Sequence, residues 1–200
     1  VLKADGMKSK YKTSLEDITG NYVFTSDNFV KMIFILLNTR ANIPVIMMGE
    51  TGCGKTSLIQ IISRLKCIKN KMKKLDIHAG ITDKDIIEFI ETNEFTNPNT
   101  KKYDLKEQQW VFFDEVNTCN SMGLLSELMT KHTMLGKPIN KNIVFIGACN
   151  PYRKVTENLK QKEEIGLVKQ KEQKVRSLVY AVNPLPYSLL HFIMNFGADR

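Results

Sequence analysis

The feature that most constrains this chain is a glycine-rich octapeptide, Gly49 to Thr56, with the pattern G-x-x-x-x-G-K-T. It follows an apolar run at 43–48 and opens into an amphipathic stretch at 57–65. The apolar run predicts a buried parallel strand, and the amphipathic stretch predicts a helix. A glycine loop between such a strand and such a helix is the sequence context of a phosphate-binding P-loop.

The residue types of this loop suit the phosphates of ATP. Glycines let successive backbone N–H groups point inward at phosphate oxygens, and the following helix adds its positive N-terminal end. Lys55 would reach the β- and γ-phosphates, and the Thr56 hydroxyl would bind Mg²⁺. Cys53 occupies a variable position, for which we expect no chemical role. The predicted nucleotide-binding residues are Gly49, Glu50, Thr51, Gly52, Cys53, Gly54, Lys55, Thr56 and Ser57.

A second apolar run, Trp110 to Phe113, ends in the acidic pair Asp114 and Glu115. Ligands of open α/β sheets bind at the carboxyl ends of the strands, so this run predicts a Walker B strand. We expect Asp114 to hold Mg²⁺, and Glu115 to orient the attacking water and accept its proton. An apolar run ending in Asp-Glu is common by itself, and its position downstream of a P-loop makes it specific.

A third apolar run, at 142–149, predicts another buried strand, which Asn150 follows. An amide at that strand end can hydrogen-bond the γ-phosphate or the attacking water, the role called sensor 1. The alternative is that Asn150 serves the turn before Pro151. The other two motifs favour the sensor, so Asn150 joins Lys55 and Glu115 as a predicted catalytic residue.

The rest of the chain predicts an alternation of strands and helices around these motifs. We expect the apolar residues of a helix over 26–38 to pack in the core, namely Phe29, Val30, Ile33, Leu36 and Leu37. The other predicted elements are a lead-in at 1–20, strands at 21–24, 74–78 and 177–182, helices at 82–96, 120–131, 153–176 and 189–196, and a hairpin at 135–138. His78 could face a substrate channel, although a structural role is commoner at a strand end. The alternation predicts a parallel sheet with helices on both faces.

Composition narrows the class of protein. The chain has 200 residues, which suits one α/β domain, and it begins with Val and runs apolar to its end, so we expect a piece of a longer protein. No apolar run approaches the ~20 residues that cross a bilayer. The net charge of +8 is concentrated at 66–74, where no aromatic residues could stack on bases, so nucleic-acid binding is disfavoured. The four cysteines form no C-x-x-C pair, which suits reduced thiols in the cytosol or nucleus.

In this order, the three motifs resemble those of the AAA+ P-loop ATPases. Four segments together are similar to an AAA+ module of the mysterin (ring finger protein 213) type of giant E3 ubiquitin ligase. They are IPVIMMGETGCGKT at 43–56, FFDEVNT at 112–118, ACNPYR at 148–153 and LVYAVNPL at 178–185. The resemblance extends over 21–197, and segments 66–74 and 160–174 depart from the family pattern.

The resemblance implies an α/β P-loop NTPase core over 21–200, with a five-stranded sheet of order 5-1-4-3-2 and a helical lid beyond the segment. It further implies a very large cytoplasmic protein in which tandem AAA+ units adjoin one another in a ring-like arrangement. Ubiquitin machinery would act through a part outside this segment, and lipid droplets are a possible location. The predicted site residues match the family motifs, which implies a hydrolysis-competent unit. An arginine finger from a neighbouring unit is implied but not assigned.

Two other functions stay open on the sequence alone. The first is a structural switch in which ATP holds adjacent units together with little turnover, since a missing arginine finger can leave binding without chemistry. The second is a motor of the dynein, midasin or helicase type, which only the basic charge supports. An intact Glu115 argues against the first alternative.

Overall fold

The protein is described by a computed structural model that covers residues 22–65, 72–93, 95, 108–151 and 182–197. Its centre is a five-stranded sheet whose strands pair in the order β2-β3-β6-β1-β7, all in parallel. The strands are β1 (Val45–Met48), β2 (Met72–Asp76), β3 (Gln109–Asp114), β6 (Ile143–Cys149) and β7 (Ile193–Asn195). Numbered along the chain, this is the order 5-1-4-3-2, so the predicted fold class is confirmed.

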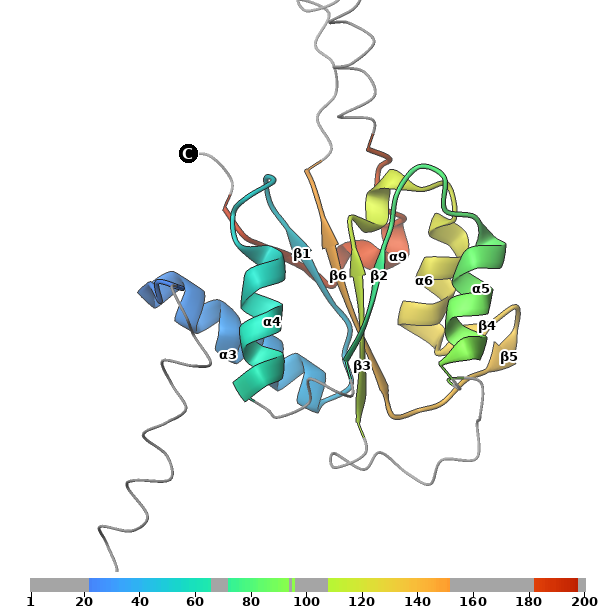
Figure 1. Ribbon diagram of the computed structural model, residues 1–200, viewed down its shortest axis with the longest axis horizontal. Coiled ribbons are helices and arrows are strands. Elements are labelled where there is room, and N and C mark those ends of the chain that lie inside the picture. Colours follow the sequence, from blue (N-terminus) through green and yellow to red (C-terminus); the bar gives the residue numbers. More distant parts are fainter. Residues whose placement is uncertain (1–21, 66–71, 94, 96–107, 152–181, 198–200) are drawn as a thin grey trace, which may run out of the picture.

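Helices cover both faces of the sheet (Figure 1). One face carries α3 (Ser26–Arg40) and α4 (Lys55–Leu65), and the other carries α5 (Asp83–Thr92), α6 (Met122–Lys131) and the short α9 (Tyr187–Leu190). A 3-10 turn, η2 (Val116–Thr118), follows β3, and a small hairpin, β4 (Thr133–Met134) with β5 (Lys137–Pro138), follows α6.

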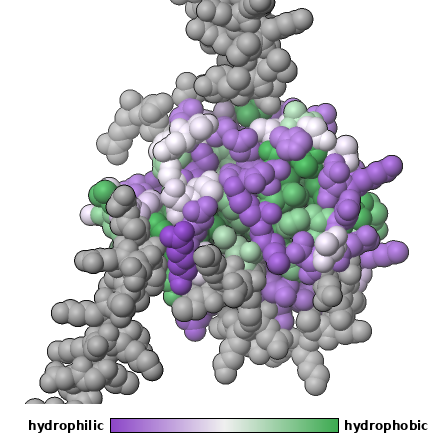
Figure 2. Space-filling view, in the orientation of Figure 1, coloured by the Kyte–Doolittle hydropathy of each residue, from purple (hydrophilic) through white to green (hydrophobic). Residues whose placement is uncertain are grey.

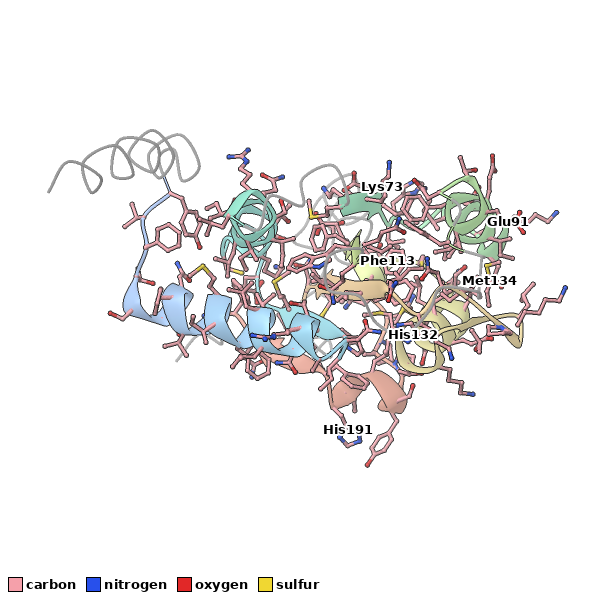
Figure 3. All side chains as sticks on the ribbon, turned by 90° about the horizontal axis from the view of Figure 1, so that it is seen from below. Lys73, Glu91, Phe113, His132, Met134 and His191 are labelled. Atoms are coloured by element: carbon pink, nitrogen blue, oxygen red, sulfur yellow. The ribbon has the colours of Figure 1, made fainter. Side chains whose placement is uncertain are left out.

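The alternation of side chains along β3 divides the core in two. Trp110 and Phe112 face α3 and α4, whereas Val111 and Phe113 face α5 and α6. Phe113 stacks on Phe145 of β6 with 5.8 Å between ring centroids. Figure 3 shows Phe113 in the interior and His191 at the periphery. Both faces of β3 are therefore buried, as a continuous apolar run in a parallel sheet predicts.

Helix α3 corrects two predictions. Residues 22–24 form no strand, whereas the helix cap expected at 25–27 is present, the Thr25 Oγ1 accepting a hydrogen bond from the Asn28 N–H at 3.1 Å. The side chains predicted to be buried are largely exposed: Phe29 by 53%, Val30 by 65%, Ile33 by 40% and Leu37 by 62%, with Leu36 half-buried. The helix packs instead through Met32, Ile35 and Thr39. The apolar spacing predicted one face of the helix as the buried face, but the helix packs on the sheet through a different face.

The C-terminal segment corrects a third prediction. The helix expected at 189–196 ends at Leu190, and the chain continues into β7 beside β1. Backbone hydrogen bonds explain the change, because the Ile46 N–H donates to the Phe192 carbonyl at 2.8 Å and the Phe196 N–H donates to the Met48 carbonyl at 2.6 Å. Pairing with a strand edge outweighs the helical spacing of the apolar residues.

The remaining predicted elements agree or lie outside the described residues. Strand β2 begins and ends two residues before its predicted bounds at 74–78, while the helices and the hairpin at 82–138 occur near their expected places. The helix predicted at 153–176 and nearly all of the strand predicted at 177–182 lie outside the described residues, as does the lead-in at 1–20.

The coloured part of the face shown in Figure 2 carries many polar residues. Apolar atoms gather on the side that carries α5 and the hairpin, where Ile87, Met134, Leu135 and Ile139 line a shallow pocket. Among the described helices, none has the length and apolar character that a membrane crossing requires.

Candidate nucleotide-binding site

A pocket of about 200 Å³ lies where β1, β3 and β6 end, at the carboxyl edge of the sheet. The loop after β1, the acidic pair after β3 and the residue after β6 all contribute to it. The lining residues are Thr51, Gly52, Gly54, Lys55, Thr56, Ser57, Asp114, Glu115, Ala148, Cys149 and Asn150. The structure thus brings together most of the predicted site residues from three separate segments.

The glycines of the loop are required for two different reasons. Gly52 and Gly54 have φ of +85° and +89°, in the left-handed region that other residues rarely adopt. Gly49 is required for space, since a Cβ there would lie 2.8 Å from both the Cys53 Sγ and the Phe196 Cβ. The loop is therefore folded tightly against β7 and opens its other side to the pocket.

Lys55 begins helix α4 and is buried, with 8% of its surface exposed. Its ammonium donates hydrogen bonds to the carbonyls of Gly49 at 2.5 Å and Glu50 at 2.9 Å. It also donates to the Asn150 Oδ1 at 3.4 Å, across from the loop. A buried cation at the start of a helix, beside outward-facing backbone groups, is suited to binding phosphate.

Asp114 and Thr56 place oxygen ligands side by side. The Thr56 Oγ1 donates to the Asp114 Oδ2 at 3.0 Å. Mg²⁺ prefers such oxygens and is usually bound through one or two carboxylates together with substrate phosphates. In the described part of the chain, no three His, Cys, Asp or Glu side chains form a metal-binding group. These two residues fit a magnesium ion.

Lys74 of β2 contacts the site residue Asp114, which its position at the end of the basic run 66–74 did not predict. Its ammonium lies 3.0 Å from the Asp114 Oδ2 and 2.5 Å from the Asp76 Oδ1. Burial opposes the charged form, but hydrogen bonds to both carboxylates outweigh it and raise the pKa of Lys74. The β2–β3 register, which pairs Asp76 with Asp114, puts this lysine next to the Asp114 carboxylate.

Glu115 has an unusual backbone for a non-glycine residue, with φ of 57° in the left-handed region. Its carbonyl accepts two hydrogen bonds from Thr118, one from the N–H at 3.0 Å and one from the Oγ1 at 2.9 Å. Strained conformations of this kind persist where the surrounding structure enforces them, often at functional sites. Glu115 is exposed and lines the pocket together with Asp114.

The end of β6 supplies a neutral thiol and an amide. Burial raises the pKa of the Cys149 thiol to about 12, even though nearby Lys55 lowers it. The next residue, Asn150, lines the pocket and is fastened through its backbone by the side chain of Asn117. Asn117 belongs to the FFDEVNT segment at 112–118, but spacing along the sequence does not identify its partner.

Three predicted residues and one candidate lie outside the lining. Gly49 and Glu50 contribute carbonyls to Lys55, and the Cys53 Sγ lies 3.7 Å from the same ammonium. His78 is exposed, and its Nδ1 accepts a hydrogen bond from the Gly80 N–H at 3.2 Å, a structural role in a turn.

Comparison with known proteins agrees with this geometry. Residues 22–153 match the family described as the RNF213 AAA domain. The chain is 38% identical over 194 residues to the E3 ubiquitin-protein ligase rnf213-beta of Danio rerio, and 35% identical over 195 residues to the E3 ubiquitin-protein ligase RNF213 of Homo sapiens. Each alignment covers 88% of this chain but 4% of the relative.

Among solved structures, PCH-2 of C. elegans is similar, with a TM-score of 0.46 and 17% identity over 74% of this chain and 43% of that one. The family match covers well over half of the chain, and the curated relatives share more than a third of their aligned residues with it. The chain is an AAA+ module and belongs to the RNF213 AAA domain family.

Proposed function

We propose that this AAA+ module binds ATP with Mg²⁺ and hydrolyses it. The observation that carries the proposal is the convergence of Lys55, Thr56, Asp114, Glu115 and Asn150 on one pocket, although they come from three segments of the chain. A cation, two oxygen ligands, a candidate base and an amide are the groups that phosphoryl transfer to water requires, since its catalysis is largely positioning and charge stabilisation.

Each residue has a distinct part in this proposal. The loop N–H groups and Lys55 hold the β- and γ-phosphates, and Lys55 balances their charge. Thr56 and Asp114 hold the magnesium ion, which when bound neutralises phosphate oxygens. Glu115 orients a water molecule and accepts its proton as the water attacks the γ-phosphorus, and Asn150 donates a hydrogen bond at the γ-phosphate.

The curated relatives are named E3 ubiquitin-protein ligases, and this chain spans 4% of their length. We propose that the module is one unit of such a large ligase and that neighbouring AAA+ units of the same chain adjoin its pocket. The match to the RNF213 AAA domain family and the small share of the relatives' length that this chain spans support this arrangement.

The test is a Glu115→Gln variant of the full parent protein, measured for steady-state ATP turnover and for ATP binding. We expect the turnover that depends on this module to fall by about a hundredfold or more while ATP binding persists, since general-base loss has effects of that size. Glu88→Gln, the same change on the exposed side of α5, serves as the matched control and should leave both quantities unchanged.

Unchanged turnover in Glu115→Gln with retained ATP binding would contradict hydrolysis at this pocket. The module would then hold a nucleotide as a structural switch. Loss of ATP binding in Lys55→Ala would still be expected in that case, because Lys55 lies at the phosphate loop irrespective of chemistry.

A further inference from the structure

Asn117 is a buried amide with an unusual pair of partners. Only 1% of its surface is exposed. Its Nδ2 donates to the Asn150 carbonyl at 2.8 Å, and its Oδ1 accepts from the Asn150 N–H at 3.3 Å. One side chain thus bonds both backbone groups of the residue that carries the candidate sensor amide.

This pairing holds the backbone from which the Asn150 side chain extends. Strand β6 ends at Cys149, so Asn150 is the first residue beyond the last regular strand position. The Asn117 amide offers one donor and one acceptor there, in the manner of a neighbouring strand. With its backbone held on both sides, Asn150 keeps its Oδ1 within 3.4 Å of the Lys55 ammonium.

Asn117 is itself held in place by the turn η2. Its carbonyl accepts a hydrogen bond from the Asn183 N–H at 2.7 Å, and the Asn183 side chain donates to the Cys119 carbonyl at 2.9 Å. The same turn contains Thr118, which bonds the Glu115 carbonyl. The candidate base Glu115 and the candidate sensor Asn150 are therefore both bonded to one short turn. Thr118 of the turn bonds Glu115, and Asn117 of the turn bonds Asn150.

We propose that Asn117 is a positioning residue that holds the Asn150 amide at the γ-phosphate side of the pocket and couples its place to that of Glu115. Asn117 does not line the pocket, so it acts through Asn150 and not on the nucleotide. The inference rests on the proposed hydrolytic function. A purely structural role for Asn117 makes a different prediction, because it would lower stability without acting through the Asn150 side chain.

The test is a double-mutant cycle in the full parent protein with Asn117→Ala, Asn150→Ala and the pair. The turnover of this module is the difference in ATP turnover between the parent protein and its Glu115→Gln variant. ATP affinity and thermal unfolding are measured on the same proteins. We expect Asn117→Ala to lower this turnover about tenfold or more, in the range found when groups that orient a catalytic residue are removed. ATP affinity should change by less than about twofold, because such a positioning interaction matters mainly in the transition state.

In the Asn150→Ala background, the same substitution should change turnover by less than about twofold, since residues that act as a unit are not additive. Asn140→Ala is the matched control. Asn140 is another buried asparagine, whose Oδ1 accepts from the Asn142 N–H at 2.8 Å at the opposite end of β6. It should leave turnover unchanged.

The proposal is contradicted if Asn117→Ala lowers turnover by the same factor in the Asn150→Ala background as in the parent protein. It is also contradicted if the fall in turnover is accompanied by a comparable fall in ATP affinity and by a loss of thermal stability. Asn117→Asp, which keeps the size and one acceptor, runs the same cycle if Asn117→Ala does not fold. Failure of both variants to fold assigns Asn117 a structural role and overturns the proposal. Parent-like turnover in Glu115→Gln contradicts the proposed hydrolysis itself, so the two failures are distinguishable.

Discussion

Helices α3 and α4 lie on the same face of the sheet (Figure 1), but they differ in how many of their large apolar side chains are buried. Helix α4 follows the phosphate loop and buries Leu58, Ile59 and Ile62 completely. Helix α3 buries Met32 and Ile35 but exposes a row of large apolar side chains that includes Phe29 and Leu37. Both sequences have apolar residues at helical spacing.

The difference teaches what an amphipathic pattern specifies. It indicates that a helix has an apolar face, but burial depends on which elements the helix meets. Helix α4 begins at Lys55, whose ammonium bonds the Gly49 carbonyl, and its fully buried residues meet the sheet. Helix α3 meets the same core through Met32 and Ile35, and near its end the Thr39 carbonyl accepts a hydrogen bond from the Gln108 Nε2 at 2.7 Å.

The difference in burial between α3 and α4 is tested by truncating one apolar side chain on each helix. Leu58→Ala should lower the free energy of opening around α4 by about 2–5 kcal/mol, the cost of removing a fully buried leucine side chain. Hydrogen exchange of α4 amides in the full parent protein measures it.

Leu37→Ala is the matched control on α3, where 62% of the leucine is exposed. We expect a change within about 0.5 kcal/mol, as for other exposed substitutions. A cost as large as that of Leu58→Ala would show that another part of the parent protein covers α3, and the contrast between the helices would disappear.

A smaller effect is expected from a substitution in the loop that precedes α4. Gly49→Ala puts a Cβ 2.8 Å from the Cys53 Sγ and the Phe196 Cβ, so the loop must shift. Overpacking of this kind costs about 1–3 kcal/mol, so we expect ATP affinity to fall about tenfold or more in a nucleotide-binding titration. Gly123→Ala, on the exposed side of α6 with no atom within 4 Å of the new Cβ, should leave affinity unchanged.

The comparison extends to α6, which holds the hairpin through a carboxylate as well as through the apolar packing of Met134. The Glu127 Oε1 accepts hydrogen bonds from the Gly136 N–H at 2.7 Å and the Thr133 Oγ1 at 2.8 Å, and these bonds lower the pKa of Glu127 below its ordinary 4.5. Because the pKa of Glu127 is lower in the folded state, its ionised carboxylate stabilises the hairpin at pH values above the ordinary pKa. This stabilisation is lost as the pH falls through the folded-state pKa.

Protection of the Gly136 amide, corrected for intrinsic exchange, should therefore decrease as the pH is lowered below about 4.5. Glu127→Gln should show weak protection at every pH and no such transition. A transition that persists in Glu127→Gln would assign the effect to another group.

The smallest effect concerns the thiols on either side of the pocket. Cys149 is 1% exposed and burial raises its pKa to about 12, whereas Cys53 is half-buried in the loop. Because the thiolate is the reactive form, maleimide at pH 8 should label Cys149 at least about tenfold more slowly than Cys53, as measured by mass spectrometry. Equal rates would show that the end of β6 opens as readily as the loop.

The sequence predicted a parallel sheet and the pocket because both depend on local patterns, whereas the strand order was implied by the family resemblance. Apolar runs place strands, and residues such as Asp114 and Asn150 come directly after them, so a parallel sheet collects them at one edge. Lys74 and Asn117 were missed because their partners depend on strand register and on a turn formed far along the chain. The strand β7 was missed because its hydrogen bonds to β1 exist only in the folded sheet.

The pairing of β7 with β1 has a mechanical consequence. The two strands are parallel, and their ladder ends with the Phe196 N–H on the Met48 carbonyl, immediately before Gly49. A pull along β7 would load these bonds in shear, which distributes the force over the whole ladder instead of unzipping it bond by bond. The displacement would reach the backbone at Gly49 first, so tension on this strand would be transmitted directly to the loop that surrounds the phosphates.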